Sequence, residues 1–147
     1  MPHVVLRSAS FSRLSGHAVK LLMDLVAQYK GDNNGDLCTA WTLMQKRGWR
    51  SRDTLNKARR ELLAGEWIMV ARQGGRHKPT LYALTFYAID ECGGKLDVNA
   101  THSPSGIWRR HEPLLPALLG APKKIANTPS VSKPQELARP ACQSMEH

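Results

Sequence analysis

The most regular feature of the chain is a run of apolar residues spaced three and four positions apart between Ser12 and Lys30. This spacing puts them on one face of an α-helix, where they can pack against a core. The face consists of Leu14, Ala18, Leu21, Leu22, Leu25, Val26 and Tyr29. The turn-forming run Gly31–Asp36 follows directly, so we expect this first helix to stop at Gly31.

A short strand and a second helix are expected next. Leu37 and Cys38 are enough for only a short strand. Thr39 is a suitable N-cap for a helix over Ala40–Arg47, and Gly48 can take the left-handed conformation that often ends a helix.

A third helix has the clearest start and stop signals. Ser51 is a suitable N-cap for Arg52–Ala64, and Gly65 follows the last helical residue. Its inner face is expected to consist of Leu55, Ala58, Leu62 and Leu63. A link of four residues, 48–51, separates it from the second helix.

Two segments rich in β-branched and aromatic residues come after the third helix, Glu66–Arg72 and Thr80–Ile89. Between them lies Gln73–Pro79, which contains two glycines and three basic side chains. We therefore expect a β-hairpin with a basic tip, in which Gly74 and Gly75 permit positive φ angles and close backbone approach.

The order of these elements is that of a winged helix-turn-helix, an α+β fold that is mainly α, with three helices and a β-hairpin wing. We assign residues 1–90 to this domain and residues 91–111 to an extension that packs on it. Seven of the nine prolines fall after residue 100, so residues 112–147 are expected to form a flexible, largely disordered tail. The stretch Arg109–Gly120, where the extension passes into this tail, carries an apolar cluster that either docks a partner protein or packs back on the domain.

Charge narrows the class of partner. The chain has 21 Lys and Arg against 12 Asp and Glu, and ten of the basic residues lie within residues 44–78, where only three residues are acidic. Double-stranded DNA is therefore the first candidate partner. No apolar run approaches the ~20 residues of a membrane span, and the start of the chain does not read as a secretory signal, so we expect a protein of the bacterial cytoplasm or nucleoid.

Enzymatic activity, metals and cofactors are not expected. Nucleophile, acid–base and phosphate-loop motifs are missing in recognisable form. The histidines share no ligand spacing, and an odd number of widely spaced cysteines, Cys38, Cys92 and Cys142, indicates free thiols.

The third helix carries the expected reading face. With Leu55 turned inward, the opposite side holds Asp53, Asn56, Lys57, Arg60 and Ala64. Asn56 offers adenine a donor and an acceptor, and Lys57 is expected on phosphate. Arg52 and Arg60 can each fork onto guanine or grip phosphate.

Two further groups are assigned to DNA binding. Arg50, Ser51 and Thr54 surround the free amides at the start of the third helix, which attract an anion such as a phosphate. The hairpin contributes basic side chains that can reach a minor groove or nearby phosphates, namely Arg72, Arg76, His77 and Lys78.

Other residues of this region are assigned structural roles. Asp53 would repel phosphate; it either accepts from a cytosine amino group or, as we favour, stabilises the start of the helix. Trp41, Trp49 and Trp67 adjoin element ends beside apolar residues and are assigned to packing. A charged outer helix face is also compatible with a plain solvated surface, and a winged helix with protein binding.

A family resemblance rests on four segments within residues 10–108: Asn34–Leu37, Arg47–Leu55, Ala58–Leu62 and Arg72–Thr85. They resemble helix-turn-helix proteins of proteobacterial prophages and mobile elements, and are similar to the winged-helix part of phage and plasmid replication proteins. The resemblance implies a role in transcription or replication of a mobile element, with the helix after Gly48 as recognition helix and the hairpin as wing. It brings no catalytic residues.

Three functions are compatible with these features. The first is a sequence-specific transcriptional regulator that binds a two-fold site as a homodimer. The second is a replication accessory that binds an origin and recruits replication proteins through the tail; the lack of a second winged domain or helicase-loading domain argues against a full initiator. The third is a phage or element protein that binds and inhibits a host protein.

Overall fold

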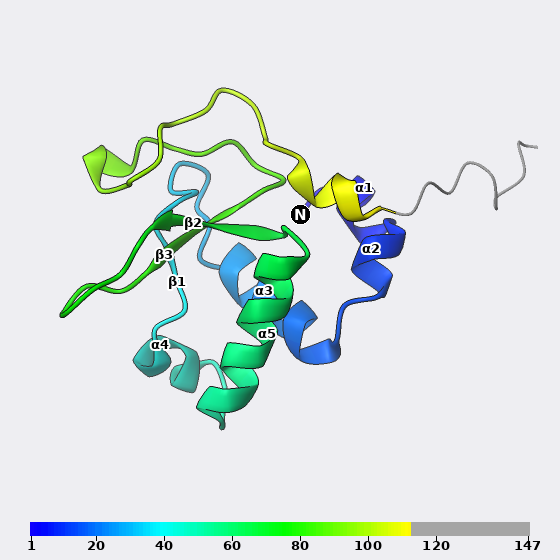
Figure 1. Cartoon of the computed structure of the whole chain (residues 1–147), viewed down its shortest axis with the longest axis horizontal. Helices are drawn as coiled ribbons and strands as arrows, with labels where there is room; N and C mark the ends of the chain where they lie inside the picture. Colours follow the sequence, from blue (N-terminus) through cyan, green and yellow to red (C-terminus); the bar gives the residue numbers. More distant parts are fainter. Residues whose placement is uncertain (113–147) are drawn as a thin grey trace, which may run out of the picture. The chain divides into compact units, whose positions relative to one another are not determined.

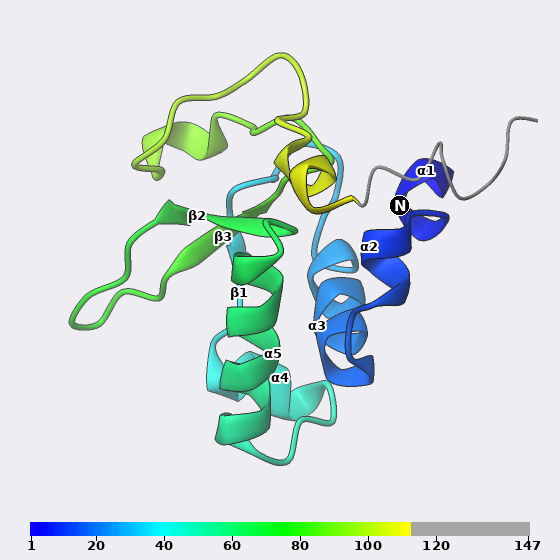
Figure 2. The same cartoon turned by 45° about the vertical axis from the view of Figure 1, so that its right-hand side comes forward.

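A computed structural model describes residues 1–112 of the chain (Figures 1 and 2). The expected disordered tail, the remainder of the apolar cluster beyond residue 112, and Cys142 lie outside these residues. The described part is α+β, as predicted, with helices and one three-stranded antiparallel sheet. Its elements in chain order are α1 (His3–Leu6), α2 (Ala9–Ser12), α3 (Gly16–Val26), β1 (Leu37–Cys38), α4 (Trp41–Lys46), α5 (Arg52–Ala64), β2 (Ile68–Arg72), β3 (Leu81–Leu84) and the 3-10 helices η1 (Cys92–Gly94) and η2 (Ile107–His111).

The sheet has the order β1-β3-β2, with β3 in the middle. In the β1–β3 pair Leu37 lies opposite Tyr82, and in the β2–β3 pair Ile68 lies opposite Leu84. The register of β2 shifts between Val70 and Arg72. The hairpin that joins β2 to β3 extends away from the body in both views (Figures 1 and 2).

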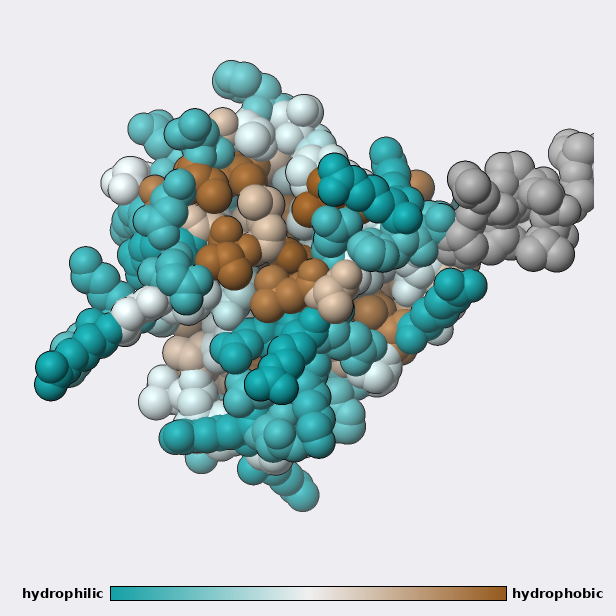
Figure 3. Space-filling view, viewed as in Figure 1, coloured by the Kyte–Doolittle hydropathy of each residue, from teal (hydrophilic) through white to brown (hydrophobic). Residues whose placement is uncertain are grey.

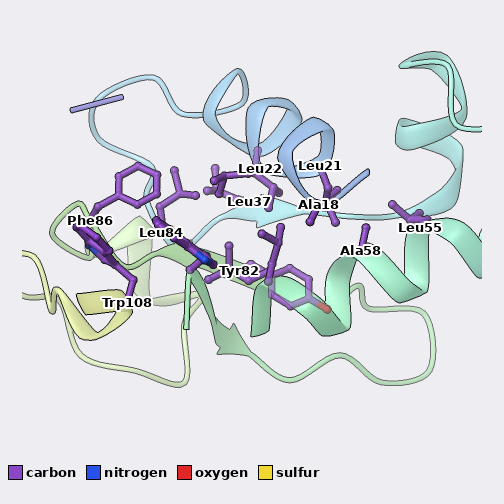
Figure 4. Close-up of a cluster of buried hydrophobic side chains, with 14 of the residues drawn as sticks. Ala18, Leu21, Leu22, Leu37, Leu55, Ala58, Tyr82, Leu84, Phe86 and Trp108 are labelled. Carbon is purple, nitrogen blue, oxygen red and sulfur yellow. The ribbon is translucent and has the colours of Figure 1, made fainter. Parts of the chain in front are cut away.

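The core lies between the sheet and the two long helices, α3 and α5 (Figure 4). The face of α3 that buries Leu21, Leu22 and Leu25 packs there with the face of α5 that buries Leu55 and Leu62. Trp49 and Trp67 are buried and Trp41 packs at the edge of the core, which confirms the packing role predicted for these three tryptophans. Burying large apolar side chains such as these supplies about 1.5–3 kcal/mol each.

The first helix is shorter than predicted. It begins at Gly16, where the Ser15 hydroxyl caps it by accepting from the Ala18 amide, and ends at Val26 rather than at Gly31. Beyond it, the Gln28 side chain bonds both backbone groups of Cys38, donating to its carbonyl and accepting from its amide at 3.0 Å each. The helix ends before Gly31 because the side-chain amide of Gln28 forms hydrogen bonds with the backbone of β1, as the backbone of an adjacent strand would.

Two other predictions are corrected at element ends. Thr39 does not cap α4; the N-cap is Ala40, which makes no side-chain cap. The second hairpin strand ends at Leu84 and not at Ile89. There the buried Asn34 amide accepts from the Leu84 amide at 2.7 Å and donates to the carbonyls of Leu84 and Ala88, so a loop side chain replaces further strand pairing.

Residues 91–112 pack on the rest of the described chain. Trp108 in η2 is buried and stacks on Trp67, with ring centroids 5.1 Å apart. The carbonyl of Ala71, at the register shift of β2, accepts from the Asp97 amide at 2.9 Å. The Glu112 carboxylate accepts from the first amides of α2, at 2.7 Å from the Ala9 nitrogen. Burial alone would raise the pKa of Glu112, but hydrogen bonds from Ser10 and Ala9 lower it below its ordinary value.

Candidate nucleic-acid interface

The start of α5 is built by a tight turn and a capped first turn. Gly48 has φ +84°, the left-handed conformation predicted for it, and any other residue would be strained there. Ser51 is extended, and its hydroxyl accepts from the Thr54 amide at 3.3 Å. The helix spans Arg52–Ala64 as predicted. These local signals place the amino end of α5 immediately after α4.

A buried carboxylate on α3 holds this turn in place. Asp24 is only 8% exposed, and its Oδ2 accepts from the Trp49 indole at 2.8 Å and from Lys20 Nζ at 2.9 Å. Lys20 also donates to the Arg47 carbonyl at 2.9 Å. Asp24 was not among the residues predicted to have a role. The signal was present, since an acidic residue that stands among inward-facing leucines requires buried partners.

Replacing Asp24 with alanine is expected to lower the free energy of unfolding by about 2–3 kcal/mol, because it leaves the buried Trp49 N–H without an acceptor. Asp24→Asn keeps an acceptor for the indole and should cost clearly less. Urea unfolding followed by circular dichroism measures both. Asp32→Ala, at an exposed acid in the following loop, is the control; equal effects of Asp24→Ala and Asp32→Ala would show that the network does not hold the turn.

The outer face of α5 is arranged as predicted. Asp53, Lys57, Arg60 and Ala64 are exposed and Asn56 is half-buried, while Leu55, Ala58 and Leu62 face the core. Asp53 pairs with Lys57 at 2.8 Å, and both side chains are more than 70% exposed. An ion pair as exposed as this contributes little, so Lys57 can exchange it for a phosphate.

The predicted phosphate seat is a hollow of about 210 Å³ at the amino end of α5. Arg50, Ser51 and Thr54 line it, as the sequence indicated. His17 and Lys20 from α3 also line it and were not predicted. Both are exposed and lie on the polar side of the helix predicted over Ser12–Lys30, whose sequence was interpreted only for its apolar face.

The hairpin tip presents Arg76, His77 and Lys78, all exposed. Its conformation differs from the prediction, since the positive φ of the tip belongs to His77, at +66°, and not to Gly74 or Gly75. Gly74 is needed for another reason, because a Cβ there would lie 2.5 Å from the Thr80 nitrogen. The fourth predicted side chain, Arg72, is half-buried and donates to the Pro79 carbonyl at 3.2 Å, so it braces the hairpin.

The acidic residues of this basic region are largely bound to other elements. Glu61 accepts from the Ser15 amide and hydroxyl at 2.7 and 2.6 Å. Glu66 pairs with His111 at 3.1 Å and with Arg110 at 3.5 Å. In the space-filling view, hydrophilic side chains cover the hairpin tip and the lower part of the face that holds α5 (Figure 3). Within residues 1–112, neither Glu61 nor Glu66 forms an ion pair with a basic side chain of α5 or of the hairpin tip.

A metal-ligand cluster and a membrane-spanning helix are both absent from residues 1–112. Among them no three His, Cys, Asp or Glu side chains gather as metal ligands, and no helix is long and apolar enough to cross a bilayer. Cys38 and Cys92 are free thiols, as predicted. No family model, curated protein or solved structure matches this chain. The function is therefore inferred from the residues of this chain and their arrangement in the structure.

Proposed function

We propose that this chain is a DNA-binding protein with a winged helix-turn-helix domain. The order of helices and strands from α3 to β3 supports this, together with the left-handed turn at Gly48 between α4 and α5 and the sheet order β1-β3-β2. In this arrangement α5 is the recognition helix, α4 is the helix before it, and the β2–β3 hairpin is the wing.

The proposed mode of binding follows from the chemistry of the exposed side chains. Recognition helix α5 enters the major groove, where Asn56 pairs with adenine and Arg60 forks onto guanine. Arg50, Ser51 and Thr54, which line the hollow at the amino end of α5, hold a phosphate there, because the amino end of a helix attracts anions. On the wing, Arg76, His77 and Lys78 contact the backbone or the minor groove.

One observation carries the proposal above the others. Helix α5 is anchored by its cap and its buried leucines, yet its outward side carries polar and basic side chains. The two nearby glutamates, Glu61 and Glu66, are bound to α3 and η2. A helix whose outer face is only solvated would have no reason to combine a basic outer face with a basic hollow at its amino end and a basic hairpin after its carboxyl end. We further propose that the protein regulates transcription, as a homodimer on a two-fold site.

Binding of the purified full chain to DNA from its own locus and to random DNA, at two salt concentrations, tests the proposal. We expect a discrete preferred site whose selectivity persists at the higher salt. About five phosphate contacts would give a slope of log affinity against log salt near −4.5. Weak binding that shows no sequence preference and vanishes at the higher salt would contradict a reading role and favour a protein partner.

A further inference from the structure

A second hollow of about 300 Å³ lies between the start of α4 and the first two turns of α5. Its apolar lining comes from Ala40, Trp41 and Leu55, and its polar lining includes Arg52, Asn56 and Arg59. The predicted reading residues Arg52 and Asn56 thus flank an apolar surface.

The guanidinium of Arg52 is held against one side of this hollow. Its central carbon lies 5.3 Å from the centre of the Trp41 ring, within the range of a cation–π contact. Such a contact uses no hydrogen-bond donor, so the N–H fork of Arg52 stays available for the edge of a base. It also limits the rotamers of an otherwise exposed side chain, which reduces the entropy lost on binding.

The geometry points to a base-reading pocket that takes a thymine next to a guanine, an inference that rests on the proposed function. The guanine presents O6 and N7 to the fork of Arg52, and the 5-methyl group of the thymine enters the hollow lined by Ala40, Trp41 and Leu55. Cytosine has no methyl group at this position, and its exocyclic amine would meet an apolar surface. Trp41 has two roles in this pocket: its ring lines the hollow that takes the methyl group, and it positions the guanidinium of Arg52.

The test uses the full chain and duplexes that carry the site selected from random DNA. We expect a thymine adjacent to a guanine within this site. Deoxyuridine in place of that thymidine removes only the methyl group and should weaken binding about threefold to tenfold, and 7-deazaguanine in place of the guanine about tenfold. In Trp41→Ala both effects should fall below about twofold, whereas Trp41→Phe, which keeps a ring under Arg52, should retain them.

Arg52→Lys separates base reading from phosphate binding, because lysine keeps the charge but has no fork. We expect this variant to lose the preference for guanine and to keep the salt slope of the unchanged protein. A thermal unfolding curve for each variant shows whether the fold is retained. For each variant, the affinity for a substituted duplex is divided by the affinity for the unsubstituted duplex, and this ratio does not depend on the fraction of active protein.

Each outcome has a distinct meaning. Absence of any preferred site would refute the proposed function and the pocket with it. A preferred site without an adjacent thymine and guanine would overturn the pocket alone. The pocket would also be refuted if the two base substitutions had no effect on the unchanged protein, or if their effects persisted in Trp41→Ala. A uniform loss of affinity for all sequences in Arg52→Lys would refute it too, because that result would assign Arg52 to phosphate binding.

Discussion

Alanine at Asn56, Lys57 and Arg60 together is expected to weaken binding to the preferred site about 100- to 1000-fold, since two base contacts of about 1–3 kcal/mol each and one phosphate contact are lost. The fold should persist, because Lys57 and Arg60 are exposed and Asn56 is only half-buried, so none of the three belongs to the buried face of α5 formed by Leu55, Ala58 and Leu62. Alanine also favours the helical state. Fluorescence anisotropy at one fixed salt concentration measures the affinity, and thermal unfolding monitors the fold.

A matched control removes the same two positive charges elsewhere. Arg13 and Lys30 are exposed and lie outside α5 and the hairpin. Alanine at both should change affinity by less than about threefold, because charges beyond a Debye length of about 8 Å from the DNA are screened at physiological salt. Similar losses in the control and the triple variant would show that net charge, rather than the face of α5, is responsible.

Replacing Asn34 with alanine is expected to lower the free energy of unfolding by about 3–5 kcal/mol, because both backbone groups of buried Leu84 lose their partner. The Asn34 side chain is fully buried and also donates to the Ala88 carbonyl at 2.7 Å. Because Asn34 is fully buried, these groups have no contact with bulk water in the folded chain. Urea unfolding followed by circular dichroism measures the change.

Asn33→Ala is the matched control, since it removes the same side chain one position earlier. Asn33 also makes two hydrogen bonds, from Lys30 N and to the Gln28 carbonyl, but it is only half-buried. Water can replace those bonds, so a loss of about 1 kcal/mol is expected. If the Asn34 and Asn33 variants were equally stable, the buried position of Asn34 would have no special role in closing the sheet.

Parts of the fold that depend on neighbours in sequence could be predicted. The bounds of α5 follow from the Ser51 cap and from leucines at helical spacing, both of which act within a few residues. The exposure of Lys57 and Arg60 follows from the same periodicity. The composition of the hairpin tip is equally local, so its three exposed basic residues were also predicted.

Features that depend on distant partners could not be predicted. The side chain of Gln28 pairs with the backbone of β1, although the sequence places Gln28 in the predicted first helix. The side chain of Asn34 pairs with the end of β3, although Asn34 looks like an ordinary loop residue in the sequence. The hollow beside Trp41 exists only because α4 and α5 meet there. The helices α1 and α2 have four residues each, too few for a periodic pattern. The pattern of residues along the chain does not indicate which side-chain amide will form hydrogen bonds with which strand.

The stacking of Trp108 on Trp67 has a spectroscopic consequence. Two indole rings 5.1 Å apart and 15° from parallel couple their electronic transitions. The folded chain should therefore show an exciton contribution in circular dichroism that does not come from its peptide bonds. That signal reports on the docking of η2 against the start of β2, whereas the peptide signal reports mainly on helices. The two can be followed in one sample, so detachment of residues 91–112 can be timed against the melting of the helices that precede them.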